Sequence, residues 1–196
     1  MADAVDRGLE EHRAVVAGIE GLLPVARAVT ERLCSAFAAG GRLYTFGNGG
    51  SAADAQHLAA ELIGRYQRAR RPLPAVALNT DPSVLTCIAN DYAYEDVFAR
   101  QVEALAGPGD VVAGFSTGGT SENVVRGLAA ARRAGATTVL FSGRGGGPAA
   151  DHADLALIVP SETTARIQEM HLLLLHVVSD GVDAWAAGAG DDGGRS

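Results

Sequence analysis

Short apolar runs alternate with longer stretches in which apolar residues recur every three or four positions. The runs are nearly continuous, which is typical of parallel strands buried on both faces. The longer stretches have the period of amphipathic helices. The pattern predicts strands at 42–46, 75–78, 111–115, 138–141 and 155–159, and helices at about 51–66, 84–89, 94–105 and 122–134.

Strands that alternate with helices predict an α/β fold. Right-handed crossovers between parallel strands favour a doubly wound, five-stranded parallel sheet that is flanked by helices on both faces. Ligands of such folds bind at the carboxyl ends of the strands. Two loops of small residues, 47–51 and 116–121, follow the first and third predicted strands. We therefore expect both loops to belong to a ligand site.

The two ends of the chain carry helical patterns of a different kind. Residues 1–40 predict a helical arm, divided near Pro24, that packs outside the main sheet or against another subunit. The domain proper is expected to span 41–187 and to end in a long helix from about residue 163. That helix is apolar on every side between Met170 and Val178, which predicts burial all round, in part by another chain. The segment 188–196 is expected to be a disordered tail.

Composition narrows the class of protein. The 196 residues suit one domain with a full core, and the net charge of −7 without a long basic run argues against a nucleic-acid partner. No apolar run reaches about 18 residues, so no membrane span is expected. The first residues lack the pattern of a secretion signal. Cys34 and Cys87 are expected to be buried thiols of a cytoplasmic protein.

The first loop combines two kinds of chemistry. Its glycines allow a tight turn and a close approach of ligand, and the helix that follows directs free backbone N–H groups and a positive dipole end toward that ligand. These features predict an anion pocket. On the same helix His57 and Glu61 are four residues apart and share a face. The alternative is an ordinary strand-to-helix turn with a polar helix face.

The second loop, 116–121, is rich in hydroxyl groups. These groups and the backbone N–H groups can together surround a dianionic phosphate. The loop contains no Lys, so it is not a nucleotide P-loop, and the first loop does not match the dinucleotide-binding pattern. The alternative is a helix cap with a turn.

The long last helix adds a further pair of side chains. Gln168 and His176 are eight residues apart, about 80° around the axis and about 12 Å along it, so both can reach one atom between them. With His57 and Glu61 they could bind Zn²⁺ or act as catalytic groups. A satisfied core histidine is the alternative for His176, and His171 fits that alternative better.

Other charged groups have simpler interpretations. His12 and His152 are interpreted as surface histidines. The basic segment 68–72 is interpreted as a solvated loop, and the glycine-rich segment 142–148 as a flexible one.

Taken together, the motifs resemble those of sugar isomerase (SIS) domain proteins and, among them, of the phosphoheptose isomerases. The resemblance covers nearly the whole chain and includes the N-terminal arm. The matching pieces are Gly47-Asn48-Gly49-Gly50-Ser51 with Asp54, His57 and Glu61; Ala89-Asn90-Asp91; Ser116-Thr117 with Ser121; and Arg166-Ile167-Gln168-Glu169 with His171 and His176.

The resemblance implies a flavodoxin-like SIS domain and an aldose–ketose isomerase. This enzyme would convert D-sedoheptulose 7-phosphate to D-glycero-D-manno-heptose 7-phosphate through an enediol, in the supply of ADP- and GDP-heptose precursors. It also implies a cytoplasmic homotetramer with active sites between subunits.

The resemblance further assigns roles to residues. Glu61 would be the base and His176 the acid, and Zn²⁺ would bind to His57, Glu61, Gln168 and His176. The residues implied to contact the sugar phosphate are Asn48, Gly49, Gly50, Ser51, Glu61, Asn90, Asp91, Ser116, Thr117, Gly118, Ser121 and Gln168.

Three positions depart from the family pattern. Gly118 and Thr120 replace the Ser and Asn that are usual in the phosphate loop, and Ala165 stands where many members have Asp. These changes bear on the choice of substrate. Two alternatives remain: a different sugar-phosphate isomerase of the same fold, and a non-catalytic SIS protein that binds a replication initiator.

Overall fold

The computed structural model describes the backbone of residues 2–191 and the side chains of residues 6–188. The described residues form one parallel sheet with the strand order β2-β1-β3-β4-β5. The strands are β1 (Leu43–Gly47), β2 (Ala75–Ala77), β3 (Val111–Ser116), β4 (Thr137–Gly143) and β5 (Leu155–Val159). The helices are α1 (Ala2–Gly18), α2 (Leu23–Ala38), α3 (Gly50–Ile63), α4 (Pro82–Asp91), α5 (Ala99–Leu105), α6 (Glu122–Arg133) and α7 (Thr164–Asp191). Short 3₁₀ segments are η1 (Ile19–Leu22), η2 (Tyr94–Asp96) and η3 (Arg144–His152).

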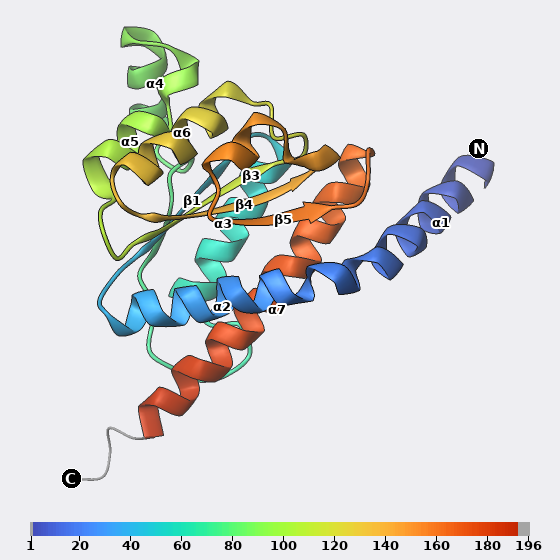
Figure 1. The fold of residues 1–196 in the computed structure, drawn as a ribbon, viewed down its shortest axis with the longest axis horizontal. Coiled ribbons are helices and arrows are strands. Elements are labelled where there is room, and N and C mark those ends of the chain that lie inside the picture. Colours follow the sequence, from blue (N-terminus) through green and yellow to red (C-terminus); the bar gives the residue numbers. More distant parts are fainter. Residues whose placement is uncertain (1, 192–196) are drawn as a thin grey trace.

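Helices cover both faces of the sheet (Figure 1). Successive strand residues point to opposite faces, so Leu43 joins the core beneath α2, α3 and α7, whereas Tyr44 and Phe46 join the core beneath α5 and α6. The strands are therefore apolar throughout, as their sequence pattern indicated. The predicted doubly wound parallel sheet is confirmed.

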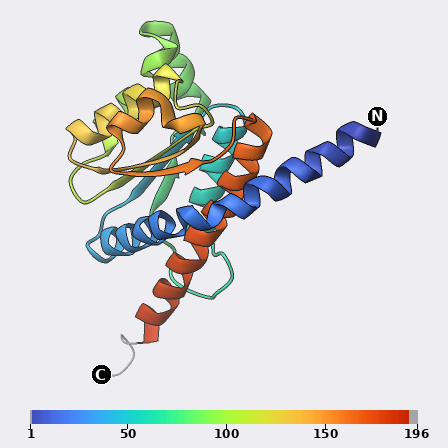
Figure 2. The same ribbon diagram turned by 45° about the vertical axis from the view of Figure 1, so that its right-hand side comes forward.

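The N-terminal arm is divided between two environments. Helix α2, which starts with Pro24 in its first turn, packs on α7 and buries Val29, Leu33 and Phe37 in the same core as α3 and α7. Of the two expected positions, outside the main sheet or against another subunit, α2 takes the first: it lies in the helical layer beside the sheet and shares the core of the domain. Only α1 extends away from the sheet (Figures 1 and 2).

Helix α1 is tied to α7 by polar contacts. Nδ1 of His12 lies 2.8 Å from Oε2 of Glu169, and the guanidinium of Arg166 donates to the carbonyl of Gly8. His12 thus lies at the surface, as interpreted, with its side chain 40% exposed, and it also has a carboxylate partner on α7.

Helix α7 crosses the molecule and extends beyond the sheet (Figure 2). Its inward side is fully buried, but Leu172, Leu173 and Val177 are 37–38% exposed. This chain alone does not bury the helix on all sides. The helix continues to Asp191, so residues 188–191 are helical rather than part of the predicted tail. Residues 192–196 lie outside the described residues.

The two cysteines differ in their exposure to solvent. Both thiols are free, but Cys34 is partly buried and Cys87 is exposed, so the prediction of two buried thiols is wrong for Cys87. Burial raises the pKa of Cys34 to about 11.

Among the helices of residues 2–191, none combines the length and apolar character that a bilayer crossing requires.

Candidate active site

A pocket opens at the carboxyl ends of β1 and β3. The chain leaves β1 for β2 on one side and returns to β3 on the other, so the strand order reverses between β1 and β3, where crevices form in such sheets. The pocket has a volume of roughly 270 Å³. Its lining comes from the loops after β1, β3 and β4 and from the start of α7: Asn48, Ser51, Phe115, Ser116, Thr117, Gly118, Thr120, Ser121, Arg144, Thr164 and Gln168.

Two helix starts at the pocket have the geometry of an anion site. Helix α3 begins after Gly49, which has φ 56°, and α6 begins after Ser121; neither of these residues caps its helix with a side-chain hydrogen bond. Later N–H groups of these turns, such as those of Ser51 and Val124, donate to nearby carbonyls. The first ones, of Gly50, Glu122 and Asn123, have no backbone acceptor among the described residues and lie at the positive ends of two helix dipoles. A phosphate suits two such helix starts that meet beside hydroxyl groups.

The phosphate-facing loop 116–121 is supported from behind by η3. A Cβ atom on Gly119 would lie 1.7 Å from the carbonyl oxygen of Gly146, so only glycine allows this contact. The N–H of Ala149 donates to the carbonyl of Gly119 at 3.0 Å. The segment 142–148, which was interpreted as a flexible loop, instead ends β4 and then packs against the phosphate-facing loop.

Asn48 is held by an amide pair that the sequence did not indicate. Asn48 and Asn123 donate to each other, at 2.8 and 2.9 Å, and the hydroxyl of Tyr94 donates to Asn48 at 3.1 Å. These bonds fix the side chain that begins the first loop. The position of Asn123 in the first turn of the helix after the second loop is the one sequence signal that could have identified it.

The second part of the site lies between α3 and α7. Nε2 of His57 is 3.0 Å from Oε1 of Glu61 and 3.4 Å from Nε2 of His176. One ligand atom from each of these residues lies within 4.8 Å of the others. The structure thus brings together the histidine and carboxylate of α3 and the histidine of α7, which are far apart in sequence.

The surroundings of this cluster favour a neutral His176. Partial burial and the neighbouring His57 lower the pKa of His176, and Glu61 opposes them. The ring of Tyr66 lies against that of His176, with centroids 5.6 Å apart. One turn before His57, burial raises the pKa of Asp54 to about 6.

The cluster fits a metal ion. Two imidazole nitrogens face each other and a carboxylate oxygen lies beside them, which is a donor set suited to Zn²⁺. Gln168 lines the pocket, and its amide packs so closely on the start of α3 that a Cβ on Gly50 would be 2.5 Å from Nε2.

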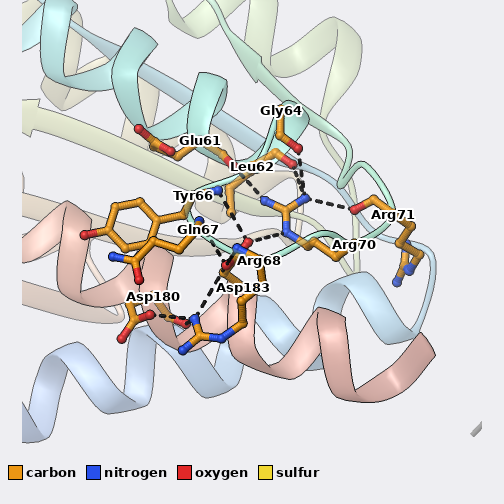
Figure 3. A network of polar contacts seen from close by, with 10 residues as sticks. All are labelled: Glu61, Leu62, Gly64, Tyr66, Gln67, Arg68, Arg70, Arg71, Asp180 and Asp183. Atoms are coloured by element: carbon orange, nitrogen blue, oxygen red, sulfur yellow. Dashed lines mark hydrogen bonds and ion pairs between the residues drawn. The ribbon is translucent and has the colours of Figure 1, made fainter. Parts of the chain in front are cut away.

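A buried ion pair holds the segment that follows α3 (Figure 3). Asp183 of α7 accepts bonds from the backbone N–H groups of Tyr66, Gln67 and Arg68 and from Nε of Arg70. Burial alone would raise the pKa of Asp183, but these donors together hold it below its ordinary value.

Arg70 completes this network from the loop side. Its side chain is fully buried and donates to the carbonyls of Glu61, Leu62, Gly64 and Arg71. The interpretation of 68–72 as a solvated loop is therefore wrong for Arg70, whose guanidinium ties the carboxyl end of α3 to α7.

The remaining predicted residues have different positions. His171 is fully buried and donates to the carbonyl of Ser142 at 3.2 Å; burial lowers its pKa to about 4, which agrees with a core histidine. Asn90 and Asp91 are exposed at the end of α4, bond to each other at 2.8 Å, and do not line the pocket formed by the described residues.

Comparisons with known proteins place this site in a family. The sequence model of the SIS domain matches residues 15–143. A phosphoheptose isomerase of Roseiflexus sp. (strain RS-1) is 55% identical over 183 residues, which cover 93% of this chain and 91% of that protein. One of Aquifex aeolicus (strain VF5) is 56% identical over 151 residues, which cover 77% of this chain and 79% of that protein.

A solved structure agrees with these sequence matches. The phosphoheptose isomerase of Neisseria gonorrhoeae is 40% identical, covers 93% of this chain and 98% of its own, and superposes with a TM-score of 0.89. The resemblance noted from the motifs is confirmed: the chain belongs to the SIS domain family and, within it, to the phosphoheptose isomerases.

Proposed function

We propose that this chain is an aldose–ketose isomerase that converts D-sedoheptulose 7-phosphate to D-glycero-D-manno-heptose 7-phosphate. The observation that carries the proposal is the convergence of His57, Glu61 and His176 on α3 and α7, the two helices whose first residues also line a pocket suited to phosphate. The high identity to phosphoheptose isomerases over most of the chain supports the same substrate. It disfavours both a different sugar phosphate and a non-catalytic role.

In this proposal the pocket holds the phosphate and the cluster performs the proton transfers. Hydroxyls of Ser116, Thr117 and Ser121 and the helix starts bind the phosphate. Glu61 removes a proton from C1 of the open-chain ketose, which gives the enediol, and returns it at C2. His176 moves a proton from the oxygen on C1 to the oxygen on C2. A neutral imidazole suits this last role, because it must accept a proton before it donates one.

We also propose Zn²⁺ as the cofactor, held by His57, Glu61 and His176 with Gln168 as a fourth ligand. The convergence of His57, Glu61 and His176 supports the first three ligands, and Gln168 is added from the family resemblance. A bound zinc ion would polarise the carbonyl group and orient the open chain. Every proton transfer above is assigned to side chains of the protein.

A homotetramer with shared active sites is a further part of the proposal. The exposed apolar side chains of α7, Leu172, Leu173 and Val177, are suited to contact another copy. Asn90 and Asp91, which lie outside the pocket of their own chain, could serve a site on a neighbouring subunit. A cytoplasmic location also remains a proposal, supported by the free thiols of Cys34 and Cys87.

The experiment is an isomerase assay on the purified protein with sedoheptulose 7-phosphate, arabinose 5-phosphate and fructose 6-phosphate, each with and without a chelator. We expect turnover of the heptose phosphate far above that of the others, with loss of activity on chelation and recovery on addition of Zn²⁺. Preference for another sugar phosphate would overturn the substrate assignment. Capture of a replication protein without any isomerase activity would favour the non-catalytic alternative.

A further inference from the structure

One cation stands at the rim of a pocket otherwise made of uncharged groups. Among the described residues that line the pocket, Arg144 is the one charged side chain. It directly follows the last residue of β4 and is exposed to solvent. Its φ of 49° lies in the left-handed region, which costs a residue with a Cβ roughly 1 kcal/mol or more. Strained backbone of this kind is common at functional sites, which points to a role for the Arg144 side chain.

The guanidinium is oriented by two of its three nitrogens. Nε donates to the carbonyl of Glu162 at 3.0 Å, and Nη2 donates to the hydroxyl of Thr164 at 2.9 Å. Nη1 has no hydrogen-bond partner among the described residues. It lies 3.8 Å from the place that a Cβ of residue 118 would occupy. The free N–H groups are thus held beside the phosphate-facing loop.

The overall charge of the protein makes a local cation important. The chain has 23 acidic and 16 basic residues, so its net charge of −7 repels a sugar phosphate at long range. Hydroxyls and backbone dipoles bind phosphate but do not neutralise it. An arginine with free, aimed N–H donors supplies both a charge and hydrogen bonds of the stronger kind.

We propose that Arg144 binds the phosphate group of the substrate through Nη1, while its contacts to Glu162 and Thr164 aim it. This inference rests on the proposed function, because it names the ligand of the same pocket. It assigns Arg144 to binding, with no part in proton transfer. Loss of the cation should therefore raise KM and leave kcat nearly unchanged.

The test combines two measurements on Arg144→Gln, Arg144→Lys and Thr164→Val. Inorganic phosphate is titrated into each protein by calorimetry, and steady-state kinetics are measured with sedoheptulose 7-phosphate. For Arg144→Gln we expect phosphate affinity to fall and KM to rise about tenfold, with kcat within about twofold. Arg144→Lys should recover part of the loss, since the charge remains, and Thr164→Val should show a smaller loss, since only the aim is relaxed.

Arg133→Gln is the matched control, because this exposed arginine on α6 pairs with Glu103 and does not line the pocket. It should leave both measurements unchanged. The proposal is overturned if Arg144→Gln binds phosphate like the unmodified protein, or if it lowers kcat with KM unchanged, which would indicate structural support of η3. If the unmodified protein fails to isomerise sedoheptulose 7-phosphate, the proposed function fails, whereas the phosphate titrations still decide the role of Arg144.

Discussion

The two parts of the site are built in different ways. The proposed phosphate end combines backbone N–H groups, hydroxyls and the guanidinium of Arg144 at the carboxyl edge of the sheet, and its loop packs against η3. The other end consists of His57, Glu61 and His176, which project from two packed helices and remain partly exposed. The backbone conformation of the loops determines the first end, whereas the side chains of two helices determine the second.

The difference separates binding from chemistry. Hydroxyls, amides and arginine do not titrate near neutral pH, so binding at the proposed phosphate end should weaken only where the phosphate itself gains a proton, at about pH 6 and below. Imidazole is the side chain that changes charge between about pH 5 and 8, so proton transfer through His176 should depend on pH. Substitutions at one end should therefore change KM and at the other kcat.

The largest effect is expected for Glu61→Gln, which removes the proposed base. A positioned acid–base group contributes about 10²- to 10⁴-fold, so kcat should fall by at least 100-fold. Affinity for the sugar phosphate should change little, since the phosphate end is intact. Calorimetry with sedoheptulose 7-phosphate and steady-state kinetics measure the two quantities. Glu103→Gln, on the exposed face of α5, is the control. Unchanged turnover in Glu61→Gln would refute the base assignment.

Asp183→Asn tests whether the helix-built end depends on the buried ion pair. The amide cannot balance the buried charge of Arg70, and loss of one partner of such a pair typically costs about 3–5 kcal/mol of unfolding free energy. Because Arg70 also binds the carbonyl of Glu61, kcat should fall more than phosphate affinity. Urea denaturation measures the stability.

Asp180→Asn is the matched control for this variant. Asp180 lies on the same helix as Asp183, but its ion pair with Arg68 is about half exposed. It should change the urea midpoint little. Equal losses of unfolding free energy in the two variants would contradict the idea that burial makes the Asp183–Arg70 pair more important for stability.

His171 is a buried core histidine, in contrast to the partly exposed His176 on the same helix. His171 binds a proton only near pH 4 in the folded state but near pH 6.5 when unfolded. Between these values the unfolded state binds more protons, so stability falls as pH is lowered, by about 3 kcal/mol in total. His171→Gln, which can still donate to Ser142, should lose this part of the pH dependence. Unfolding free energies at pH 4.5 and 7 compare the two proteins, and equal pH dependence would contradict the burial argument.

The smallest effect is expected at the phosphate end. Ser116→Ala removes one hydroxyl, which also accepts the N–H of Gly119 at 3.2 Å. KM should rise about threefold to tenfold, with kcat unchanged, because the backbone groups remain. Ser35→Ala on the exposed side of α2 should have no effect on either constant. A large fall in kcat for Ser116→Ala would show that the two ends are coupled.

Much of the fold follows from the pattern of apolar residues. The strands are short and apolar on both sides, so their number and parallel arrangement could be predicted. The packing of α2 could not, since its stripe of Val29, Leu33 and Phe37 fits another subunit as well as this sheet. Only the three-dimensional arrangement shows which surface it covers.

The candidate site was predictable where residues lie in one loop or on one helix face. His57 and Glu61 are neighbours by helical spacing alone, and the spacing of Gln168 and His176 on the last helix indicated the second pair, to which the resemblance added roles. The network of Arg70 and Asp183 could not be predicted, because its donors come from irregular backbone more than 110 residues away in sequence from the carboxylate. The orientation of Arg144 likewise depends on a single unusual φ angle.

The backbone contact between Gly119 and Gly146 limits how this enzyme could be redesigned. A Cβ on Gly119 would collide with the main chain of Gly146, and a Cβ on Gly146, which has φ 87°, would crowd the side chains of Ile158 and Ala150. A library aimed at other sugar chain lengths should therefore leave both glycines untouched. It should vary the exposed rim at Thr120 and keep Thr164, whose hydroxyl orients Arg144.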